Sequence, residues 1–228
     1  MSTIAVVTGA GRGIGRAVAL QLAERGCDVA LLARTVEQIE QVAGEIASRG
    51  RRAVALRCDV ANAGEVARAA ERIEDELGAP RVVVSNAGIV RRELVVDMDE
   101  ADWDAVVDVN LKGAFLVARA MLPKMIQAGR GRFVAVASIS SRLGTPRQSA
   151  YCAAKWGLVG FTKSLAEEIR PHGLQAICVL PGSVDTEMLK GSGFKPQMTP
   201  EDVASTVVYA ALDAPAAMNG SALEMFGP

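Results

Sequence analysis

Histidine is scarce in this sequence and closely spaced cysteines are lacking, and each of these features argues against a class of site. The one histidine, His172, lies in the helix-stop stretch Arg-Pro-His-Gly, which rules out a His-rich metal site and most Ser-His-Asp schemes. The four cysteines, Cys27, Cys58, Cys152 and Cys178, are far apart and lack Cys-x-x-Cys spacing. Buried thiols are therefore favoured over disulfides or metal ligands, and we expect no metal.

Net charge and long apolar runs are also lacking. The 25 basic and 26 acidic residues give a formal charge of −1, so neither a nucleic-acid footprint nor a polybasic membrane patch is indicated. No run approaches the roughly 18 apolar residues of a membrane span, and Met1 leads into a strand pattern without a signal peptide. We expect a cytoplasmic protein that binds a small molecule and neither nucleic acid nor membrane.

Short apolar runs alternate with helical patterns along all 228 residues, a length that suits one domain spanning 1–228. Strands are predicted at 4–7, 28–32, 53–57, 82–85, 133–137, 174–180 and 221–225. Helices are predicted directly after Gly15 and at 36–49, 62–77, 101–127, 149–170 and 200–212. The strands 82–85 and 133–137 are apolar on both faces, as central parallel strands are.

A glycine-rich turn follows the first predicted strand. The candidate cofactor-binding residues in it are Gly9, Gly11, Arg12, Gly13, Ile14 and Gly15. Glycines let the backbone approach a pyrophosphate, and the free N–H groups at the start of the next helix bind its charge. Ile14 breaks the usual Gly-x-Gly-x-x-Gly spacing. The strand before and the helix after favour a dinucleotide site over glycines that merely turn the chain.

The end of the second strand indicates which dinucleotide is bound. An NAD-binding protein usually has an acidic residue here to accept the ribose hydroxyls, but this chain has Ala33 followed by Arg34. The Arg34 guanidinium, helped by Arg12, suits a 2′-phosphate, and no carboxylate repels it. NADP(H) is therefore favoured over NAD(H). The alternative is that both are ordinary surface arginines.

Further candidates lie where other strands end. Asp59, followed by Val60, can accept from an adenine amino group or cap the helix that begins near Asn62. The run Asn86, Ala87, Gly88 can line the cofactor or make the turn. Ser138 ends the fifth predicted strand, where a reacting group belongs in this architecture.

The catalytic hypothesis centres on Tyr151 and Lys155. In a helix at 149–170 they are four residues apart, so the phenol and the ammonium project from one face. A neighbouring cation lowers a phenol's pKa from about 10 and makes it usable as an acid or base. Ser138 can hold a carbonyl or hydroxyl oxygen beside it. Ser140 is either a substrate contact or a cap of the turn before Leu143.

Two helical segments, 101–127 and 149–170, are apolar nearly all around, so we expect both to pack against a second subunit in a homodimer or homotetramer. Asn110 is a polar side chain within the first. It either makes a structural hydrogen bond or orients a water or backbone group at the active site. The stretch 187–198 combines glycines with apolar residues, which suits a lid over substrate or an ordinary surface loop.

Nearly end to end, the sequence resembles the short-chain dehydrogenase/reductase family in its compact single-domain branch. The resemblance rests on Thr8–Gly15, Asn86–Gly88, Asn110, Ser138 with Tyr151 and Lys155, and Pro181-Gly182. Within the family the sequence looks most like the 3-oxoacyl-acyl-carrier-protein reductases and related alcohol and ketone dehydrogenases. The stretch Met218–Ser221 replaces the family's Thr-Gly-Gln approach to the last strand, which leaves assembly through the tail open.

The resemblance implies an α/β, three-layer Rossmann fold, a doubly wound parallel sheet of about seven strands with helices on both faces. It also implies carbonyl reduction by NADPH, with Tyr151 as proton donor, Ser138 holding the oxygen, Lys155 on the nicotinamide ribose and Asn110 anchoring a water. Further cofactor contacts are implied at Pro181, Gly182, Val184 and Thr186. The alternatives are oxidation of a secondary alcohol or polyol, and a regulator that senses NADPH without turnover.

Overall fold

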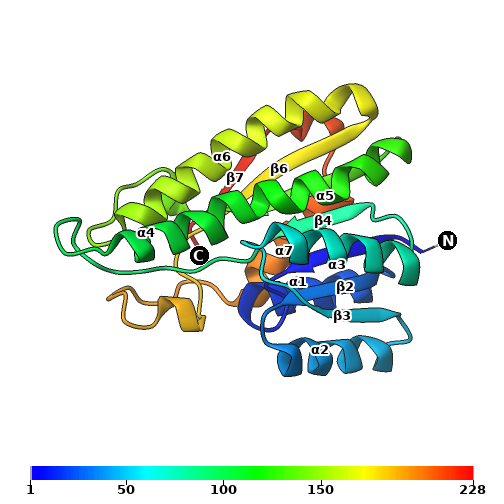
Figure 1. Cartoon of the computed structure of the whole chain (residues 1–228), viewed down its shortest axis with the longest axis horizontal. Coiled ribbons are helices and arrows are strands. Elements are labelled where there is room, and N and C mark those ends of the chain that lie inside the picture. The colour runs from blue at the N-terminus through cyan, green and yellow to red at the C-terminus, as the bar shows by residue number, and fades with distance from the viewer. Residues whose placement is uncertain (1, 228) are drawn as a thin grey trace.

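The computed structural model describes residues 2–227, in which seven strands form one sheet (Figure 1). The strands are β1 (Ile4–Thr8), β2 (Asp28–Ala33), β3 (Ala53–Arg57), β4 (Val82–Ser85), β5 (Gly131–Val136), β6 (Leu174–Pro181) and β7 (Ala222–Met225). Their order is β3-β2-β1-β4-β5-β6-β7, and every neighbouring pair is parallel. The predicted Rossmann fold with its doubly wound sheet is confirmed.

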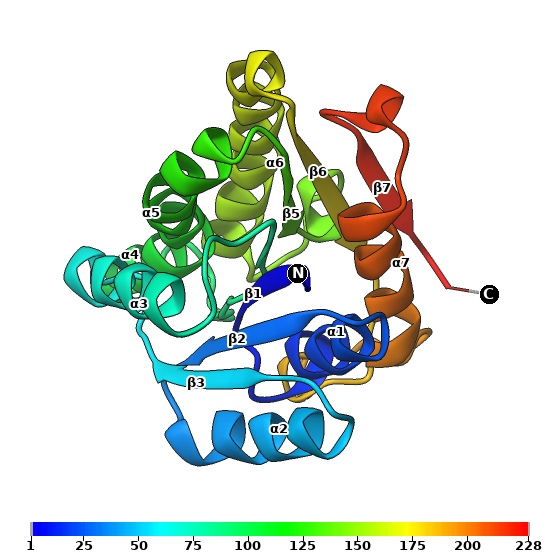
Figure 2. The same cartoon turned by 90° about the vertical axis from the view of Figure 1, so that its right-hand side faces the viewer.

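Helices cover both faces of the sheet, so the molecule has three layers (Figure 2). One face carries α1 (Gly13–Glu24), α2 (Val36–Ser48) and α7 (Pro200–Leu212). The other carries α3 (Ala63–Glu76), α4 (Glu100–Val107), α5 (Gly113–Gln127) and α6 (Ser149–Ile169). Successive strand residues point to opposite faces, so Val6 enters one core and Val7 the other. This explains why the central strands are apolar at every position.

The helix predicted at 101–127 is present, but it is not a continuous α-helix. Between α4 and α5 the backbone forms a π-helical segment, Asp108–Lys112. The widened turn contains Asn110, whose Nδ2 donates to the Val106 and Ile89 carbonyl oxygens, both at 2.8 Å. Such π-turns are rare and often occur at functional sites. Every other predicted element is present. The first helix begins at Gly13, three residues earlier than predicted, and the other ends differ by at most two residues.

All carboxyl ends of the strands lie at one edge of the sheet because the strands are parallel. The chain begins at the right of Figure 1, so these ends lie toward the left. β1 has β2 on one side and β4 on the other, and the connections from these strands lead away in opposite directions. A crevice for ligands opens at such a reversal point.

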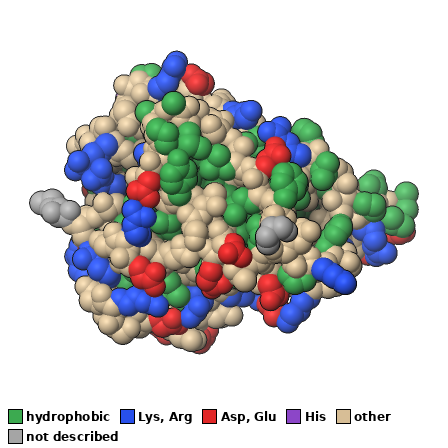
Figure 3. Space-filling model, turned by 180° about the vertical axis from the view of Figure 1, so that it is seen from behind, with side chains coloured by type: hydrophobic (Ala, Val, Ile, Leu, Met, Phe, Trp, Pro, Cys, Tyr) green, Lys and Arg blue, Asp and Glu red, His purple; other side chains and the backbone are tan. Residues whose placement is uncertain are grey.

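Some large apolar side chains remain on the surface. They include Trp103, Phe115 and Trp156 on the α4, α5 and α6 layer, and Trp156 is 52% exposed. On the opposite side of the molecule, Figure 3 shows hydrophobic side chains gathered among charged ones. Within residues 2–227, none of the helices combines the length and hydrophobicity that a bilayer crossing requires.

Phe133 on β5 gives a direct test of this packing. It is fully buried and meets Phe161 edge to face, with ring centroids 6.4 Å apart. Replacing Phe133 with Ala should lower the free energy of unfolding by about 3–5 kcal/mol, because a large cavity remains in a close-packed core. Urea unfolding measures the change. The control Phe194→Ala, at a side chain 55% exposed, should change it by less than about 0.5 kcal/mol. Equal effects would contradict the described core.

Candidate active site

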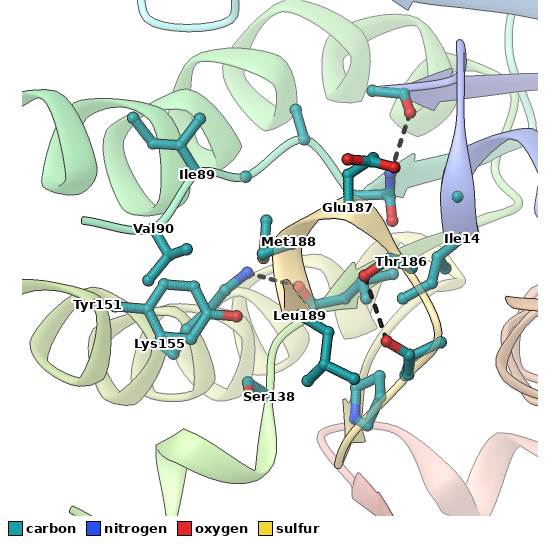
Figure 4. A pocket seen from close by; sticks show the side chains of 18 of the residues that line it. Ile14, Ile89, Val90, Ser138, Tyr151, Lys155, Thr186, Glu187, Met188 and Leu189 are labelled. Carbon is teal, nitrogen blue, oxygen red and sulfur yellow. Dashed lines mark hydrogen bonds between the residues drawn. The ribbon is translucent and has the colours of Figure 1, made fainter. Parts of the chain in front are cut away.

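A cavity of about 1200 Å³ lies at the carboxyl edge of the sheet, at the reversal point between β1 and β4. Its walls come from the segments that follow β1, β2, β3, β4, β5 and β6, and from residues of α6. The volume exceeds that of most single-ligand pockets, so a dinucleotide and a small substrate fit together. Figure 4 shows Ser138, Tyr151 and Lys155 at this cavity, with Ile89, Val90 and the Thr186–Leu189 segment around them.

The glycine-rich turn is shaped by positions that only glycine can occupy. Gly9 and Gly13 have φ values of 64° and 53°, in the left-handed region that other residues rarely adopt. A Cβ on Gly15 would lie 2.2 Å from the Gly9 carbonyl oxygen. Gly15 is buried and packs α1 against the turn rather than lining the cavity, whereas Gly9, Gly11, Arg12, Gly13 and Ile14 line it.

The start of α1 is suited to an anion. Arg12 is the N-cap residue, and its side chain makes no capping hydrogen bond. The first N–H groups of the helix are therefore free of a side-chain cap, and the helix dipole adds partial positive charge at the same place. A phosphate group bound there would accept from these groups.

Thr8 and Asn86 fasten the turn after β1 to the turn after β4. The Thr8 hydroxyl oxygen accepts from the Asn86 and Ala87 backbone N–H groups at 2.9 and 3.0 Å. The Asn86 Nδ2 donates to the Thr8 carbonyl oxygen at 2.9 Å. The Asn86 side chain thus holds the two cavity walls together, while Ala87 and Gly88 line the cavity beside it.

Arg12 and Arg34 line the cavity with Ala33, as the cofactor hypothesis requires. Both arginines are exposed, and within residues 2–227 neither forms an ion pair. Two guanidinium groups are therefore free to bind a phosphate at the end of β2.

Asp59 and Val60 also line the cavity, but the capping interpretation of Asp59 is wrong. The N-cap of α3 is Asn62, whose Oδ1 accepts from the Gly64 and Glu65 N–H groups at 3.0 and 3.1 Å. Asp59 uses Oδ1 in a local turn, where it accepts from the Ala61 N–H at 3.0 Å. Asn62 is nearer to the first helical N–H groups, so Asn62 rather than Asp59 is the N-cap residue of α3.

Tyr151 and Lys155 project from one face of α6, as their spacing predicts. The Lys155 Nζ lies 5.6 Å from the centroid of the Tyr151 ring and donates to the Val136 carbonyl oxygen at 2.9 Å. Tyr151 is 8% exposed and Lys155 is 4% exposed. Ser138 follows β5, and its Oγ accepts from the Ser140 N–H at 3.2 Å. Among residues 2–227 the Ser138 hydroxyl donates no hydrogen bond, so its proton can be donated to a ligand oxygen.

Burial controls the acidity of the two groups. It raises the pKa of Tyr151 to about 12, an effect that the Ser138 hydroxyl and the Arg92 charge only partly offset. Burial lowers the pKa of Lys155 to about 8. The expected lowering of the phenol's pKa by Lys155 is therefore wrong for this structure, because removal of both groups from water outweighs their proximity. At neutral pH the phenol is protonated.

Asn110 does not line the cavity. Its Nδ2 makes two backbone hydrogen bonds, but its Oδ1 is buried and has no partner among the described residues. A Cβ built on Gly88 would lie 2.7 Å from this oxygen and 3.7 Å from the Lys155 Nζ. The orphaned acceptor thus faces the small space beside Lys155, where a water molecule could be held.

The segment after β6 closes one side of the cavity. Pro181, Gly182, Val184 and Thr186 line it, as do residues from Glu187 to Phe194. The base of the loop is fixed by a bridge between Val184 and Met198 and by the Gln197 N–H, which donates to the Ser183 carbonyl oxygen at 2.9 Å. The loop therefore forms one wall of the cavity, a position that suits the predicted lid. Ser140 is buried and lines the cavity.

Several cavity residues were not anticipated from the sequence. Ile89 and Val90 directly follow the Asn86–Gly88 turn, and the rule that ligands gather at strand ends could have extended to them. Thr35 and Gln38, at the start of α2, lie beside Arg34. Arg92 reaches the site from an irregular segment that has no sequence signal. In residues 2–227 no three His, Cys, Asp or Glu side chains converge as a metal site would require.

Comparison with known proteins points to one family. A family model described as short chain dehydrogenase matches residues 3–196. The chain is 38% identical over 224 residues to a 3-oxoacyl-acyl-carrier-protein reductase of Synechocystis sp., covering 94% of this chain and 91% of that protein. It is 37% identical over 247 residues to a (3R)-3-hydroxyacyl-CoA dehydrogenase of Canis lupus familiaris, covering 99% and 95%. A solved short-chain type dehydrogenase/reductase from Mycobacterium marinum superposes with a TM-score of 0.94 at 33% identity, covering 99% and 94%.

The lowered pKa of Lys155 predicts how stability depends on pH. The folded protein loses this proton near pH 8, but the unfolded chain keeps it to about the ordinary value of 10.5. Between these values the unfolded state binds more protons, so the free energy of unfolding rises with pH. Above pH 10 the raised pKa of Tyr151 acts in the opposite direction. From pH 8 to 10, cofactor-free protein should gain roughly 2–3 kcal/mol relative to Lys155→Met.

Urea unfolding of both proteins at pH 7, 8, 9 and 10 measures this difference. Lys155→Met is the reference because it keeps the length of the side chain and removes the titrating group. Parallel stability curves from pH 8 to 10 would contradict the lowered pKa.

Proposed function

The chain belongs to the short-chain dehydrogenase family of oxidoreductases, and from this premise we propose that it reduces a ketone to a secondary alcohol with NADP(H). The observation that carries the proposal is the buried, protonated phenol of Tyr151 beside Ser138 and Lys155 at the edge of a cavity large enough for a dinucleotide. A protonated acid placed there can donate to a carbonyl oxygen.

The residues around the cavity fit NADP(H). The glycine cradle and the free N–H groups of α1 would hold the pyrophosphate, and Arg12 with Arg34 would hold the 2′-phosphate. The segments after β3, β4 and β6 would line the rest of the dinucleotide, and Lys155 would bind the nicotinamide ribose. When bound, NADPH supplies the hydride.

The polar groups then have distinct roles in the reduction. Tyr151 donates its proton to the carbonyl oxygen, and the Ser138 hydroxyl donates a hydrogen bond that holds this oxygen. A carbonyl that accepts two such hydrogen bonds is stabilised as negative charge develops on its oxygen. The Asn110 Oδ1 holds a water near Lys155, so a proton from solvent can replace the one that Tyr151 gives up.

Two alternatives to ketone reduction are oxidation of an alcohol, which reverses the reaction, and binding of NADPH without any reaction. Oxidation of a secondary alcohol needs the phenolate of Tyr151, which burial disfavours, so reduction is favoured near neutral pH. Because one relative is named as a (3R)-3-hydroxyacyl-CoA dehydrogenase, oxidation of an alcohol is the second candidate reaction. A regulator that only senses NADPH would need neither the free Ser138 hydroxyl nor the orphaned Asn110 oxygen, and their presence argues against it.

We also propose that the protein is a homodimer or homotetramer. Trp156 on α6 and Phe115 on α5 are exposed apolar side chains on helices that also pack against the sheet, and a second subunit would cover them. A cytoplasmic location is supported by the four cysteines, all of which are free thiols.

Replacing Tyr151 with Phe tests the mechanism. The variant keeps the ring and loses the proton donor, so kcat for ketone reduction should fall by at least about 10²–10⁴-fold. The Kd for NADPH should stay within about threefold, because the ring still fills its place on α6. Stopped assays that follow NADPH absorbance give kcat, and quenching of protein fluorescence gives Kd. A variant as active as the wild type would refute the assignment.

Replacing Arg34 with Gln tests the cofactor preference. Loss of one charge-assisted hydrogen bond to the 2′-phosphate should raise the Kd for NADPH about tenfold or more and leave the Kd for NADH within about twofold. The matched control is Arg72→Gln, which removes an exposed arginine that pairs with Glu76 on α3. Equal weakening of both dinucleotides, or of neither, would contradict a role in 2′-phosphate binding.

A further inference from the structure

Arg92 lines the cavity from the irregular segment between β4 and α4. Its Nη2 donates to the Met188 carbonyl oxygen at 2.6 Å, so the guanidinium connects this segment to the lid turn Glu187–Leu189. Arg92 is also one of the charges that act on Tyr151. The guanidinium is therefore close to the proton donor and to the lid at once.

The charges on either side of Arg92 are already paired. Arg91 pairs with Asp102 at 2.9 Å, and Glu93 pairs with Arg147 at 3.1 Å. Within residues 2–227, Arg92 itself has no carboxylate oxygen within 4.0 Å. Of this run of three charged residues, it alone lacks a counter-ion in the described part of the chain.

The backbone holds this arrangement in place. Arg147 has a φ of 64°, in the left-handed region that costs energy for a residue with a side chain. Its carbonyl oxygen accepts from the Glu93 N–H at 3.0 Å while its side chain binds the Glu93 carboxylate. This strained contact engages the carboxylate of the adjacent Glu93, so that carboxylate does not pair with Arg92.

The Nε of Arg92 is buried and has no hydrogen-bond acceptor among the described residues. A buried N–H group without a partner is costly, and that cost falls when a ligand supplies an acceptor. An arginine offers its N–H groups in a planar fork that matches the two oxygens of a carboxylate. The position therefore favours an anionic group on the substrate.

We propose that Arg92 determines specificity by binding a carboxylate on the substrate, so that the preferred substrates are small oxo acids. This rests on the proposed ketone reduction. Arg92 and Tyr151 line the same cavity, so a substrate that reaches both would carry its carboxylate and its ketone in one small molecule, as a 3-oxo acid does. The bond to the Met188 carbonyl oxygen keeps the lid turn in contact with the residue that holds the carboxylate.

The test compares two ketones that differ chiefly in charge, acetoacetate and ethyl acetoacetate. With NADPH at pH 7, the wild type should have the higher kcat/KM for acetoacetate. Arg92→Gln keeps a donor for the Met188 carbonyl oxygen but removes the charge. It should lower kcat/KM for acetoacetate by on the order of 10- to 100-fold, mainly through KM, and leave the ester within about threefold.

Two further variants separate charge from structure. Arg92→Lys restores a positive charge and should recover part of the preference for acetoacetate, but not all of it, because the fork is lost. The neighbouring Arg91→Gln removes an equal charge that is already paired with Asp102. It should leave the ratio of the two kcat/KM values within about twofold.

A binding measurement that involves no reaction tests the carboxylate site independently of the proposed ketone reduction. Calorimetric titration of the wild type in the presence of NADPH should detect butyrate but not butyramide, and Arg92→Gln should lose the butyrate signal. If no ketone is reduced but butyrate still binds through Arg92, the proposed function fails and the carboxylate site stands.

Other outcomes overturn the inference while the proposed function survives. One is a wild type that reduces the ester as well as or better than acetoacetate. Another is an Arg92→Gln variant that loses activity equally on both substrates, which would limit Arg92 to holding the lid. A third is a preference for a CoA thioester over its N-acetylcysteamine analogue that disappears in Arg92→Gln, because that pattern assigns the charge to a carrier phosphate.

Discussion

Every strand of the sheet runs in the same direction, and the rest of the molecule depends on that constraint. Parallel strands need helical crossovers, which cover both faces and bury the strands from two sides. The same constraint brings all carboxyl ends to one edge, so residues as distant in sequence as Gly9, Asn86 and Ser138 line one cavity. The hydrogen bonds between Thr8 and the Asn86 turn then fix the two central walls relative to each other.

Burial decides the electrostatics of this site. Tyr151 and Lys155 are both almost removed from water, and desolvation favours the neutral form of each. Proximity alone predicts an acidic phenol, but the structure holds a protonated phenol beside a lysine whose pKa approaches the physiological range. A protonated donor next to the free Ser138 hydroxyl suits delivery of a proton to a carbonyl oxygen.

Polar groups without partners are informative here because buried groups are normally satisfied. Five buried side-chain atoms lack a partner among the described residues, and two of them, the Asn110 Oδ1 and the Arg92 Nε, belong to residues beside Lys155 or in the cavity wall. Asn110 occurs where a π-turn interrupts a helix, and Arg92 is held by a segment that ends in a strained contact with Arg147. At these two positions, a departure from regular structure coincides with a polar group that has no partner among the described residues.

The sequence alone determined whatever depends on neighbours along the chain. The strand, turn and helix around Thr8–Gly15, the shared face of Tyr151 and Lys155, and the bounds of nearly all elements follow from local spacing and apolar pattern. Only the tertiary structure decided what depends on distant residues. Desolvation set the direction in which the Tyr151 pKa shifts. Competition for the same N–H groups made Asn62 rather than Asp59 the N-cap of α3. Arg92 is held at the cavity by a hydrogen bond to the Met188 carbonyl oxygen, 96 residues away in the sequence. Burial and charge pairing are summed over the folded surroundings, and that sum cannot be read from local sequence.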